Sequence, residues 1–530
     1  MKLLKNIGLA IFLLGLVIFT ALPFLGSFKM SEQIMLEQLS EQELGNLQSD
    51  FEEKIIDVEF GTSSAFGNAV IDIYNTKNEE LKANEEWDKV MYTQEKEFAF
   101  KLAKASTTGF VADNKLLLFF LSFGLGILGA LIYVYQDLKL LGPAGIKNDG
   151  VYHSAAQNRG WIGIVTFLWL VSFYVLLYFN PHIIVNLTNV VDPVKHLFNP
   201  EAGASQWFLY GFLYTVTMIV MGIRMLIKYR HNKYQVVRTI TVVLFQLIFA
   251  FLMVEILPLF DLPAKDLKNA WPLDHYFLFD WNVQQLLSSG HFGKFLFFWG
   301  IILSIIVVPV MVYFFGKRWY CSWVCGCGGL AETLGDPYRQ LSNKKLWTWK
   351  LERWLINGVL VFAVIMTIYT GYHTYNVYNN PDMDGKDILF GLSAYDVRSW
   401  YGFLIGSIFA GVIGTGFYPI LGNRSWCRFG CPLAAYMGIV QRFKSRFRIT
   451  TNGGQCISCG NCSTYCEQGI DVRAYAQKGQ NIVRSSCVGC GVCAAVCPRG
   501  VLKLENGPEE GRFGNEGPIV LGNDGFKIDV

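Results

Sequence analysis

The chain has 530 residues, of which 52% are apolar and only 16% are charged, and its formal net charge at neutral pH is +3. Soluble globular proteins usually carry about 25% charged residues, so this composition favours a membrane protein over a large water-soluble domain. The small net charge gives no indication of nucleic-acid binding.

Eight apolar runs are long enough to cross a bilayer, which takes about 20 residues each. They cover residues 6–28, 114–136, 161–180, 207–228, 237–258, 293–316, 351–371 and 400–421. The first run follows Lys2 and Lys5 as in a signal peptide, but it is longer than the apolar part of one and no A-x-A-like cleavage site follows. We therefore predict an uncleaved membrane anchor over residues 1–28, with the other membrane helices within 113–316 and 351–421.

Lysine and arginine are distributed unevenly between the two sets of loops. One set has basic clusters near residues 139–159, 228–238 and 317–350, whereas the opposite set holds only Lys195, Lys265, Lys268, Lys386 and Arg398. Basic loops tend to stay in the cytoplasm. This bias predicts a multi-pass protein of the bacterial inner membrane with both termini in the cytoplasm.

Residues 29–112 are then predicted to lie outside the cytoplasm. This segment is rich in Glu, Gln, Lys and Leu, as in "SEQIMLEQLSEQELGNLQSDFEEKI", and its pattern is helical and charged. One interpretation is a solvated helical hairpin. The other is a docking platform for an extracytoplasmic partner.

All thirteen cysteines lie between Cys321 and Cys497. A disulfide-bonded secreted protein would distribute its cysteines through its extracellular parts. The clustering favours metal ligation or thiol chemistry on the reducing side of a membrane.

Two runs near the C-terminus have the spacing C-x₂-C-x₂-C-x₃-C of bacterial ferredoxins. Three cysteines of each run are expected to hold one [4Fe–4S] cluster, while the fourth reaches across to the other cluster. One cluster is thus assigned to Cys456, Cys459, Cys462 and Cys497, and the other to Cys487, Cys490, Cys493 and Cys466. Structural zinc prefers two separated CxxC pairs. Residues 451–506 are therefore predicted to form an α+β ferredoxin domain with two [4Fe–4S] clusters, followed by a tail over 507–530.

A second kind of cysteine element occurs twice at predicted cytoplasmic helix ends. "KRWYCSWVCGCGG" opens the loop 317–350, and "GNRSWCRFGCPLAA" opens the element and linker 422–450. Each contains C-x₃-C, and on a helix such positions share a face, so the pairs Cys321–Cys325 and Cys427–Cys431 are each expected to present two thiols, with Cys327 as a fifth. Three interpretations remain open, namely a further iron–sulfur or metal centre, redox-active thiols, and structural cysteines.

This combination of membrane helices, paired C-x₃-C elements and a dicluster ferredoxin motif resembles the polyferredoxin family of NapH, NosR and CcoG over roughly residues 290–505. The resemblance implies electron transfer between the quinone pool, iron–sulfur clusters and extracytoplasmic reductases, or, in the CcoG branch, metal handling during oxidase assembly. The first element departs from the family pattern because no proline follows Cys325. The sequence "STTGF" at 106–110 does not match a flavin-attachment signature, so no covalent flavin is expected.

Few polar residues lie within the apolar runs. His182, His196, His275, His291 and His373 fall at or beyond the predicted outer helix ends, so intrinsic haem is not expected. Glu255 is the one acid well inside a run and is a candidate proton acceptor for quinol, with a carboxylate that reaches the surface as the alternative. Arg224 is predicted to snorkel toward the membrane surface.

The sequence thus predicts a mainly α, polytopic helix bundle with a C-terminal ferredoxin domain. The predicted function is iron–sulfur electron transfer that links the quinone pool or a cytoplasmic donor to a redox complex or extracytoplasmic reductase. Expected partners are membrane lipid, quinone or quinol, and redox subunits carrying haem, flavin or copper. The alternatives are a maturation factor that reduces metals or thiols for a respiratory oxidase or reductase, and a structural subunit.

Overall fold

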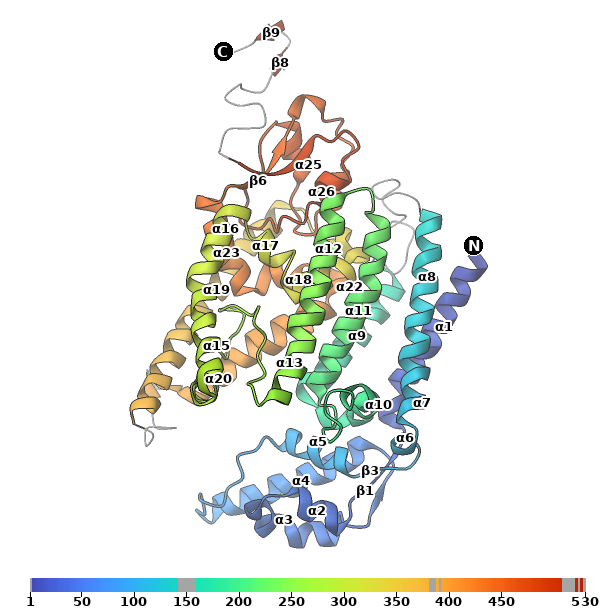
Figure 1. Cartoon of the computed structure of the whole chain (residues 1–530), viewed down its shortest axis with the longest axis vertical. Coiled ribbons are helices and arrows are strands. Elements are labelled where there is room, and N and C mark those ends of the chain that lie inside the picture. Colours follow the sequence, from blue (N-terminus) through green and yellow to red (C-terminus); the bar gives the residue numbers. More distant parts are fainter. Residues whose placement is uncertain are drawn as a thin grey trace. The chain divides into compact units, whose positions relative to one another are not determined.

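The computed structural model describes residues 2–141, 159–380, 388–389, 392–507, 520–522 and 525–527 (Figure 1). Most of the predicted tail therefore lies outside the described residues. The chain divides into two compact units. Unit 1 comprises Met1–Leu140 and Ser172–Tyr214, and unit 2 comprises Leu141–Val171 and Thr215–Val530. Each unit is described by itself.

In the described part of the chain, eight helices are long and apolar enough to cross a membrane. They are Lys2–Phe24, Lys115–Leu140, Trp161–Phe179, Gln206–Lys228, Lys233–Phe260, Gly290–Phe315, Leu346–Asn379 and Asp396–Gly416. The prediction of a mainly α, multi-pass membrane protein is confirmed. The first helix ends earlier than predicted, because the chain turns into strand β1 (Ser27–Lys29).

Several of these spans are built from consecutive helical elements. Their bounds are α1 (Lys2–Ala21), η1 (Leu22–Phe24), α7 (Lys115–Phe119), η2 (Phe120–Gly124), α8 (Leu125–Leu141), α9 (Trp161–Phe179), α11 (Gln206–Lys228), α12 (Lys233–Phe245), η5 (Gln246–Leu252), α13 (Met253–Ile256), η6 (Leu257–Phe260), α15 (Gly290–Ile302), η7 (Leu303–Val307), α16 (Val308–Phe315), α19 (Leu346–Asn379), α20 (Ala394–Tyr401), η10 (Gly402–Ile413) and α21 (Gly414–Gly416).

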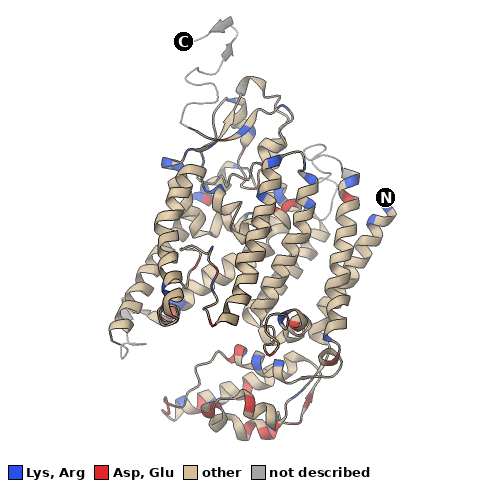
Figure 2. Ribbon diagram, viewed as in Figure 1, with Lys and Arg blue, Asp and Glu red and all other residues tan. Residues whose placement is uncertain are grey.

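Residues 29–112 form a small domain within unit 1. Its elements are α2 (Glu32–Gln38), α3 (Glu41–Lys54), β2 (Glu59–Phe60), α4 (Ser63–Ala83), α5 (Glu95–Ala105), β3 (Thr107–Thr108) and α6 (Phe110–Asp113). Strand β1 pairs antiparallel with both β2 and β3, with Phe28 opposite Phe60 on one side and Thr107 on the other. Acidic residues are frequent along its helices (Figure 2).

The hairpin interpretation of this segment is wrong. Its helices and sheet enclose a core of their own that includes Phe28, Phe51, Phe66, Tyr74 and Leu102, all buried. Glu and Gln separate the apolar residues along the sequence, so the pattern predicts a solvated hairpin and does not reveal the core. Burial of several aromatic rings at about 1.5–3 kcal/mol each is what holds such a domain together. Unit 1 also contains η4 (Pro181–Ile183) and α10 (Val185–Lys195).

Unit 2 contains the remaining membrane helices and the cysteine-rich elements. The further bounds are α14 (Asp280–Ser288), α17 (Arg318–Cys321), α18 (Gly326–Thr333), η8 (Asp336–Leu341), β4 (Ile388–Leu389), β5 (Leu392–Ser393), α22 (Tyr418–Leu421), η11 (Trp426–Gly430), α23 (Pro432–Lys444), β6 (Phe447–Thr451), η12 (Gly453–Gln455), α24 (Asn461–Thr464), α25 (Val472–Gln477), α26 (Val492–Ala495), β7 (Leu502–Asn506), β8 (Val520–Gly522) and β9 (Gly525–Lys527).

The ferredoxin part of unit 2 is framed by one antiparallel strand pair. Strand β6 pairs with β7, with Phe447 opposite Asn506 and Thr451 opposite Leu502. The two short helices α24 and α26 each begin after a glycine with positive φ, +81° at Gly460 and +75° at Gly491. Glycine adopts this conformation without steric cost, so each C-x₂-C segment can turn sharply between its cysteines.

The non-helical residues 261–279 fold back into the helix bundle, and we call them the return segment (Figure 1). Trp271 donates to the Ser304 hydroxyl, near the middle of the span Gly290–Phe315, at 2.9 Å. The prediction that His275 lies at or beyond an outer helix end is wrong. Its ring packs within the bundle against Tyr401, because the segment that carries it returns among the helices.

Candidate iron–sulfur site

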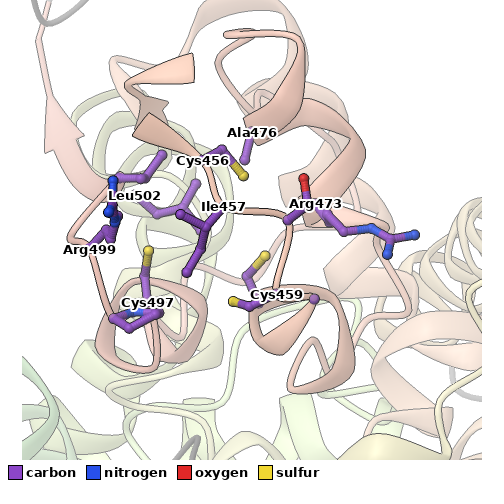
Figure 3. Close-up of a pocket in the computed structure, with 13 residues that line it drawn as sticks. Cys456, Ile457, Cys459, Arg473, Ala476, Cys497, Arg499 and Leu502 are labelled. Carbon is purple, nitrogen blue, oxygen red and sulfur yellow. The ribbon is translucent and has the colours of Figure 1, made fainter. Parts of the chain in front are cut away.

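The first predicted set of four cysteines lines one pocket. Cys456, Cys459, Cys462 and Cys497 all contribute to its wall, together with Pro498 and Leu502. Figure 3 shows Cys456, Cys459 and Cys497 around the same space. Cys459 is exposed whereas Cys462 is buried, so one side of this pocket faces the surroundings.

The second predicted set lines a separate pocket. Cys466 lies there with Cys487, Cys490 and Cys493, so the fourth cysteine of each run does cross to the other set. Cys487 and Cys493 are buried. Burial raises the pKa of the Cys487 thiol to about 11 and that of Cys490 to about 12. Metal binding to these thiols therefore displaces protons.

The two pockets differ in kind from a site for a single ion. Among the described residues, no three His, Cys, Asp or Glu side chains are close enough together to hold one metal ion. In each pocket the thiols line a wall, as ligands at the four corners of a cubane do. The cysteine types and their arrangement fit [4Fe–4S] clusters.

The juxtamembrane C-x₃-C pairs do not lie on single helices as predicted. Cys321 is the last residue of α17, and Cys325 is the N-cap residue of the next helix, α18. Likewise Cys427 lies in η11, and Cys431 is the N-cap of α23, where its sulfur accepts from the Ala434 N–H at 3.4 Å. The i,i+4 argument fails because the chain leaves the helix between the two cysteines, so the second cysteine takes the N-cap position of a new helix.

The two elements nevertheless have the same local structure. Gly316 and Gly422, which precede them, have φ of +66° and +93°. A β-carbon at Gly316 would lie 2.7 Å from Phe447, and one at Gly422 would lie 2.8 Å from the Ser342 backbone. Positive φ and close neighbours both exclude other residues at these turns. The sequence repeat is therefore also a structural repeat.

The five juxtamembrane cysteines converge in one place. Cys321, Cys325, Cys427 and Cys431 are buried in one apolar cluster, and Cys327 packs against it. Cys427 acts electrostatically on Cys321 and Cys327 of the other repeat and on Cys431 of its own, in keeping with thiols of the two repeats that lie near one another. We call this group the juxtamembrane thiol cluster.

A buried ionic network that the sequence did not predict reaches these cysteines through Arg424. Its carboxylates are Glu332, Asp336 and Glu467, and its cations are Arg224, Lys228, Arg238, Arg339 and Arg424. The prediction that Arg224 snorkels is wrong, since Arg224 is buried and paired with Asp336. Lys228, Arg238 and Arg339, which the charge pattern assigns to cytoplasmic loops, are thus members of this network. Figure 2 shows blue and red positions among helices of the bundle that are otherwise mostly tan.

Arg424 and Glu467 are the centre of this network. Arg424 binds Glu332 and lies 3.0 Å from Glu467, and it also approaches the Cys427 sulfur at 3.7 Å. Glu467, which directly follows Cys466, lies 3.1 Å from Arg339. Burial favours the protonated acid, but Arg424 and Arg339 lower the pKa of Glu467 below its usual value.

The network carries more positive than negative charge, with five buried cations facing three buried carboxylates. Buried charge is expensive unless it is compensated. Arg339 and Arg238 both act electrostatically on Cys490. Deprotonated cluster ligands supply the missing negative charge, so the electrostatics also fit an anionic cluster. The sequence signal for this network was Glu467 beside a ligand cysteine and Arg424 three residues before Cys427.

The other predicted polar residues lie apart from the cysteines. Glu255 is half-buried in α13, close to the end of its span, and lines neither cysteine pocket. His373 is buried within α19, which extends beyond the predicted helix end, whereas His291 is exposed at the start of α15. His182 is buried in η4, and His196 is the C-cap residue of α10.

Comparisons with known families agree with the two kinds of cysteine element. Residues 448–498 match the 4Fe-4S dicluster domain. The 4Fe-4S binding domain matches twice, over 296–346 and 401–450, and each match contains one C-x₃-C element. The internal repeat is thereby confirmed.

Curated relatives cover the same part of the chain. YccM of Escherichia coli, named for electron transport, is 28% identical over 185 residues, which are 32% of this chain and 46% of the relative. The methylamine utilization ferredoxin-type protein MauN of Methylobacillus flagellatus is 25% identical over 35% of this chain and 59% of the relative. The ferredoxin-type protein NapH of Escherichia coli is 23% identical over 36% of this chain and 60% of the relative.

The chain thus spans about half to three-fifths of the length of these relatives. No solved structure matches the chain. The cysteine runs, the repeated 4Fe-4S binding domain and the ferredoxin-type relatives support an iron–sulfur electron-transfer role. Together they confirm the resemblance of this membrane protein to the NapH-like polyferredoxins.

Proposed function

We propose that the protein is a membrane-bound electron-transfer subunit that carries two [4Fe–4S] clusters in its ferredoxin module and a third iron–sulfur centre at the juxtamembrane thiol cluster. The observation that carries this proposal is the succession of three cysteine groups within unit 2. The Cys456 group has an exposed member, the Cys466 group is mostly covered, and the juxtamembrane cysteines lie within the bundle.

Direct contacts join the second group to the bundle. Tyr234 and Gln235 of α12 donate to the carbonyls of Gly489 and Cys490, both at 2.8 Å. Ser322, between Cys321 and Cys325, donates to the Val488 carbonyl at 3.0 Å. Val488 belongs to the same apolar cluster as the juxtamembrane cysteines. The residues that hold one centre therefore touch those that hold the next.

The proposed ligands follow the two pockets and the repeat. The cluster in the pocket with an exposed side, which we call the outer cluster, is held by Cys456, Cys459, Cys462 and Cys497. The cluster in the pocket that contacts the helix bundle, which we call the inner cluster, is held by Cys466, Cys487, Cys490 and Cys493. Cys321, Cys325, Cys427 and Cys431 are the repeat-related ligands of the third centre, with Cys327 beside them. Such clusters supply one-electron chemistry at potentials between about −700 and +450 mV.

The membrane donor or acceptor is proposed to be quinol or quinone. Oxidation of one quinol releases two electrons and two protons, and two one-electron centres accept the electrons separately. Glu255 in α13 is the proposed acceptor of one of these protons, and the other passes to water at the membrane surface. The exposed side of the Cys456 pocket suits contact with a second redox protein, and a partner carrying haem, flavin or copper would extend the path across the membrane.

The decisive experiment is anaerobic reduction of the purified protein by a reduced menaquinone analogue, followed by EPR and iron analysis. We expect cluster signals to appear and about twelve irons per chain for three cubane centres. If only dithionite reduces the clusters, quinol is not the donor, and electrons enter from a cytoplasmic ferredoxin-like protein instead.

The maturation-factor alternative is favoured by one specific contact. Cys325 and Cys327 interact directly through their thiols, as a pair that handles metal or exchanges disulfides would. About eight irons per chain would leave all five juxtamembrane thiols free for that chemistry. Retained activity after Cys456→Ala and Cys487→Ala would instead support a purely structural subunit.

The proposed orientation places both termini in the cytoplasm of a bacterial inner membrane and residues 29–112 outside. Gly45 and Gly507 both have open space around their α-carbons. We expect Gly45→Cys in intact spheroplasts to react with a membrane-impermeant maleimide, and Gly507→Cys to react only after lysis. The reverse result would invert the topology.

A further inference from the structure

The return segment carries four charged residues into the helix bundle. Lys265 and Asp274 are buried and lie 3.1 Å apart, and Lys268 lies 2.8 Å from Asp266. Ionisable groups at membrane depth are costly, and they indicate function by default. Irregular backbone at this depth is tolerated only where protein surrounds it.

Side chains from several helices hold the segment at defined points. Trp299 donates to the Leu267 carbonyl at 2.9 Å, and Tyr320 donates to the Lys268 carbonyl at 2.8 Å. The indole of Trp271 donates to Thr367 of α19 at 2.7 Å. Tyr320 immediately precedes Cys321, so the backbone of Lys268 is fixed next to the first C-x₃-C element.

The segment also contacts the juxtamembrane thiol cluster directly. Ala270 is fully buried in the same apolar cluster as Cys321, Cys325 and Cys427. The Lys268 ammonium acts electrostatically on Cys325 and Cys327. This ammonium is paired with Asp266 at 2.8 Å, and the Lys268 side chain is only 8% exposed.

We infer that the return segment exists to hold Lys268 as a fixed positive charge beside the juxtamembrane centre, and that this charge raises the reduction potential of that centre. The inference rests on the proposed third centre. An added electron makes the centre more negative, so a nearby cation stabilises the reduced form most. In this low-dielectric surrounding the charge is weakly screened, and neighbouring groups of this kind tune metal centres. Lys268 is a positioning residue in this scheme.

The test is an EPR-monitored redox titration of the detergent-purified full chain with Lys268→Met. Methionine has similar length and no charge. At a fixed potential, the reduced-to-oxidised ratio of the third centre should fall at least tenfold, which is about 59 mV for a one-electron couple. The two ferredoxin centres should keep their potentials. Lys268→Arg retains the charge and should restore the wild-type value.

A matched control removes the other ion pair of the same segment. The variant with Lys265→Met and Asp274→Asn loses a pair of similar burial, and it should leave the third potential unchanged. If Lys268→Met alone does not fold because Asp266 is left uncompensated, the double variant with Asp266→Asn removes that carboxylate as well and should show a smaller shift in the same direction.

The outcomes separate this inference from the proposed function. Twelve irons with an unshifted third potential in Lys268→Met would overturn the role of Lys268 and leave the third centre in place. Equal shifts of the third potential in Lys268→Met and in the matched control would also overturn it, because a change in the packing of the segment would then explain both shifts. About eight irons in the unmutated protein would overturn the third centre, and this inference with it.

Discussion

A chain with Cys321→Ala and Cys427→Ala should no longer be reduced by a menaquinol analogue, while dithionite still reduces its ferredoxin-module clusters. The two cysteines come from different repeats, and both are buried among the juxtamembrane thiols. Their loss removes one ligand from each half of the proposed third centre. The route from the membrane to the inner ferredoxin cluster is then interrupted, whereas a soluble reductant still reaches the exposed side of the Cys456 pocket.

The measurement combines iron analysis with stopped-flow absorbance under both reductants. Iron should fall from about twelve to about eight per chain, since a cubane holds four. Cys327→Ser serves as the control, because it lies outside the repeat and is expected to retain twelve irons. Unchanged quinol reduction in the double variant would show that electrons bypass the juxtamembrane cysteines.

Glu467→Gln should destabilise unit 2 strongly. The carboxylate lies between Arg339 and Arg424, both fully buried, and the amide would leave their charges without this counter-ion. Breaking a buried pair by removing one partner costs about 3–5 kcal/mol. Thermal unfolding, followed by the loss of cluster absorbance, should show a lower Tm and faster loss of iron.

Glu505→Gln is the matched control for this change. Glu505 is half-buried in β7 and lies 3.7 Å from the exposed Lys503, and an ion pair with such an exposed partner contributes roughly 0–1 kcal/mol. Its Tm should stay close to that of the unmutated chain. If both variants unfold at the same temperature, the stability of the buried network does not depend on the negative charge of Glu467.

The membrane helices and cysteine runs could be predicted because each leaves a local signal. A run of about 20 apolar residues is long enough to cross a bilayer and is stable in few other environments. The spacing of the ferredoxin cysteines defines which of them share a pocket. The crossing of Cys466 and Cys497 between the two pockets follows from the same spacing. The repeat is visible in the Arg-x-x-Cys pattern that its two copies share, at Arg318 and at Arg424.

The features that were missed depend on contacts between distant residues. Glu332, Asp336 and Glu467 look like ordinary loop or helix acids until the fold brings arginines to them. The return segment is too short and too polar for its sequence to predict a membrane element, so the sequence pattern places Lys268 in an outer loop. The N-cap position of Cys325 could not be predicted because no proline marks the helix break within its C-x₃-C element.

The hydrogen bonds that seat the ferredoxin module also constrain how the protein is made. Gln441 donates to the carbonyl of Cys487 at 2.9 Å, and Gln235 donates to that of Cys490 at 2.8 Å, so the bundle covers the loop that forms the inner pocket. Iron and sulfide delivered after docking would have to pass this cover. We therefore expect the inner cluster to be inserted before the module docks, and a module that lacks this cluster to dock poorly.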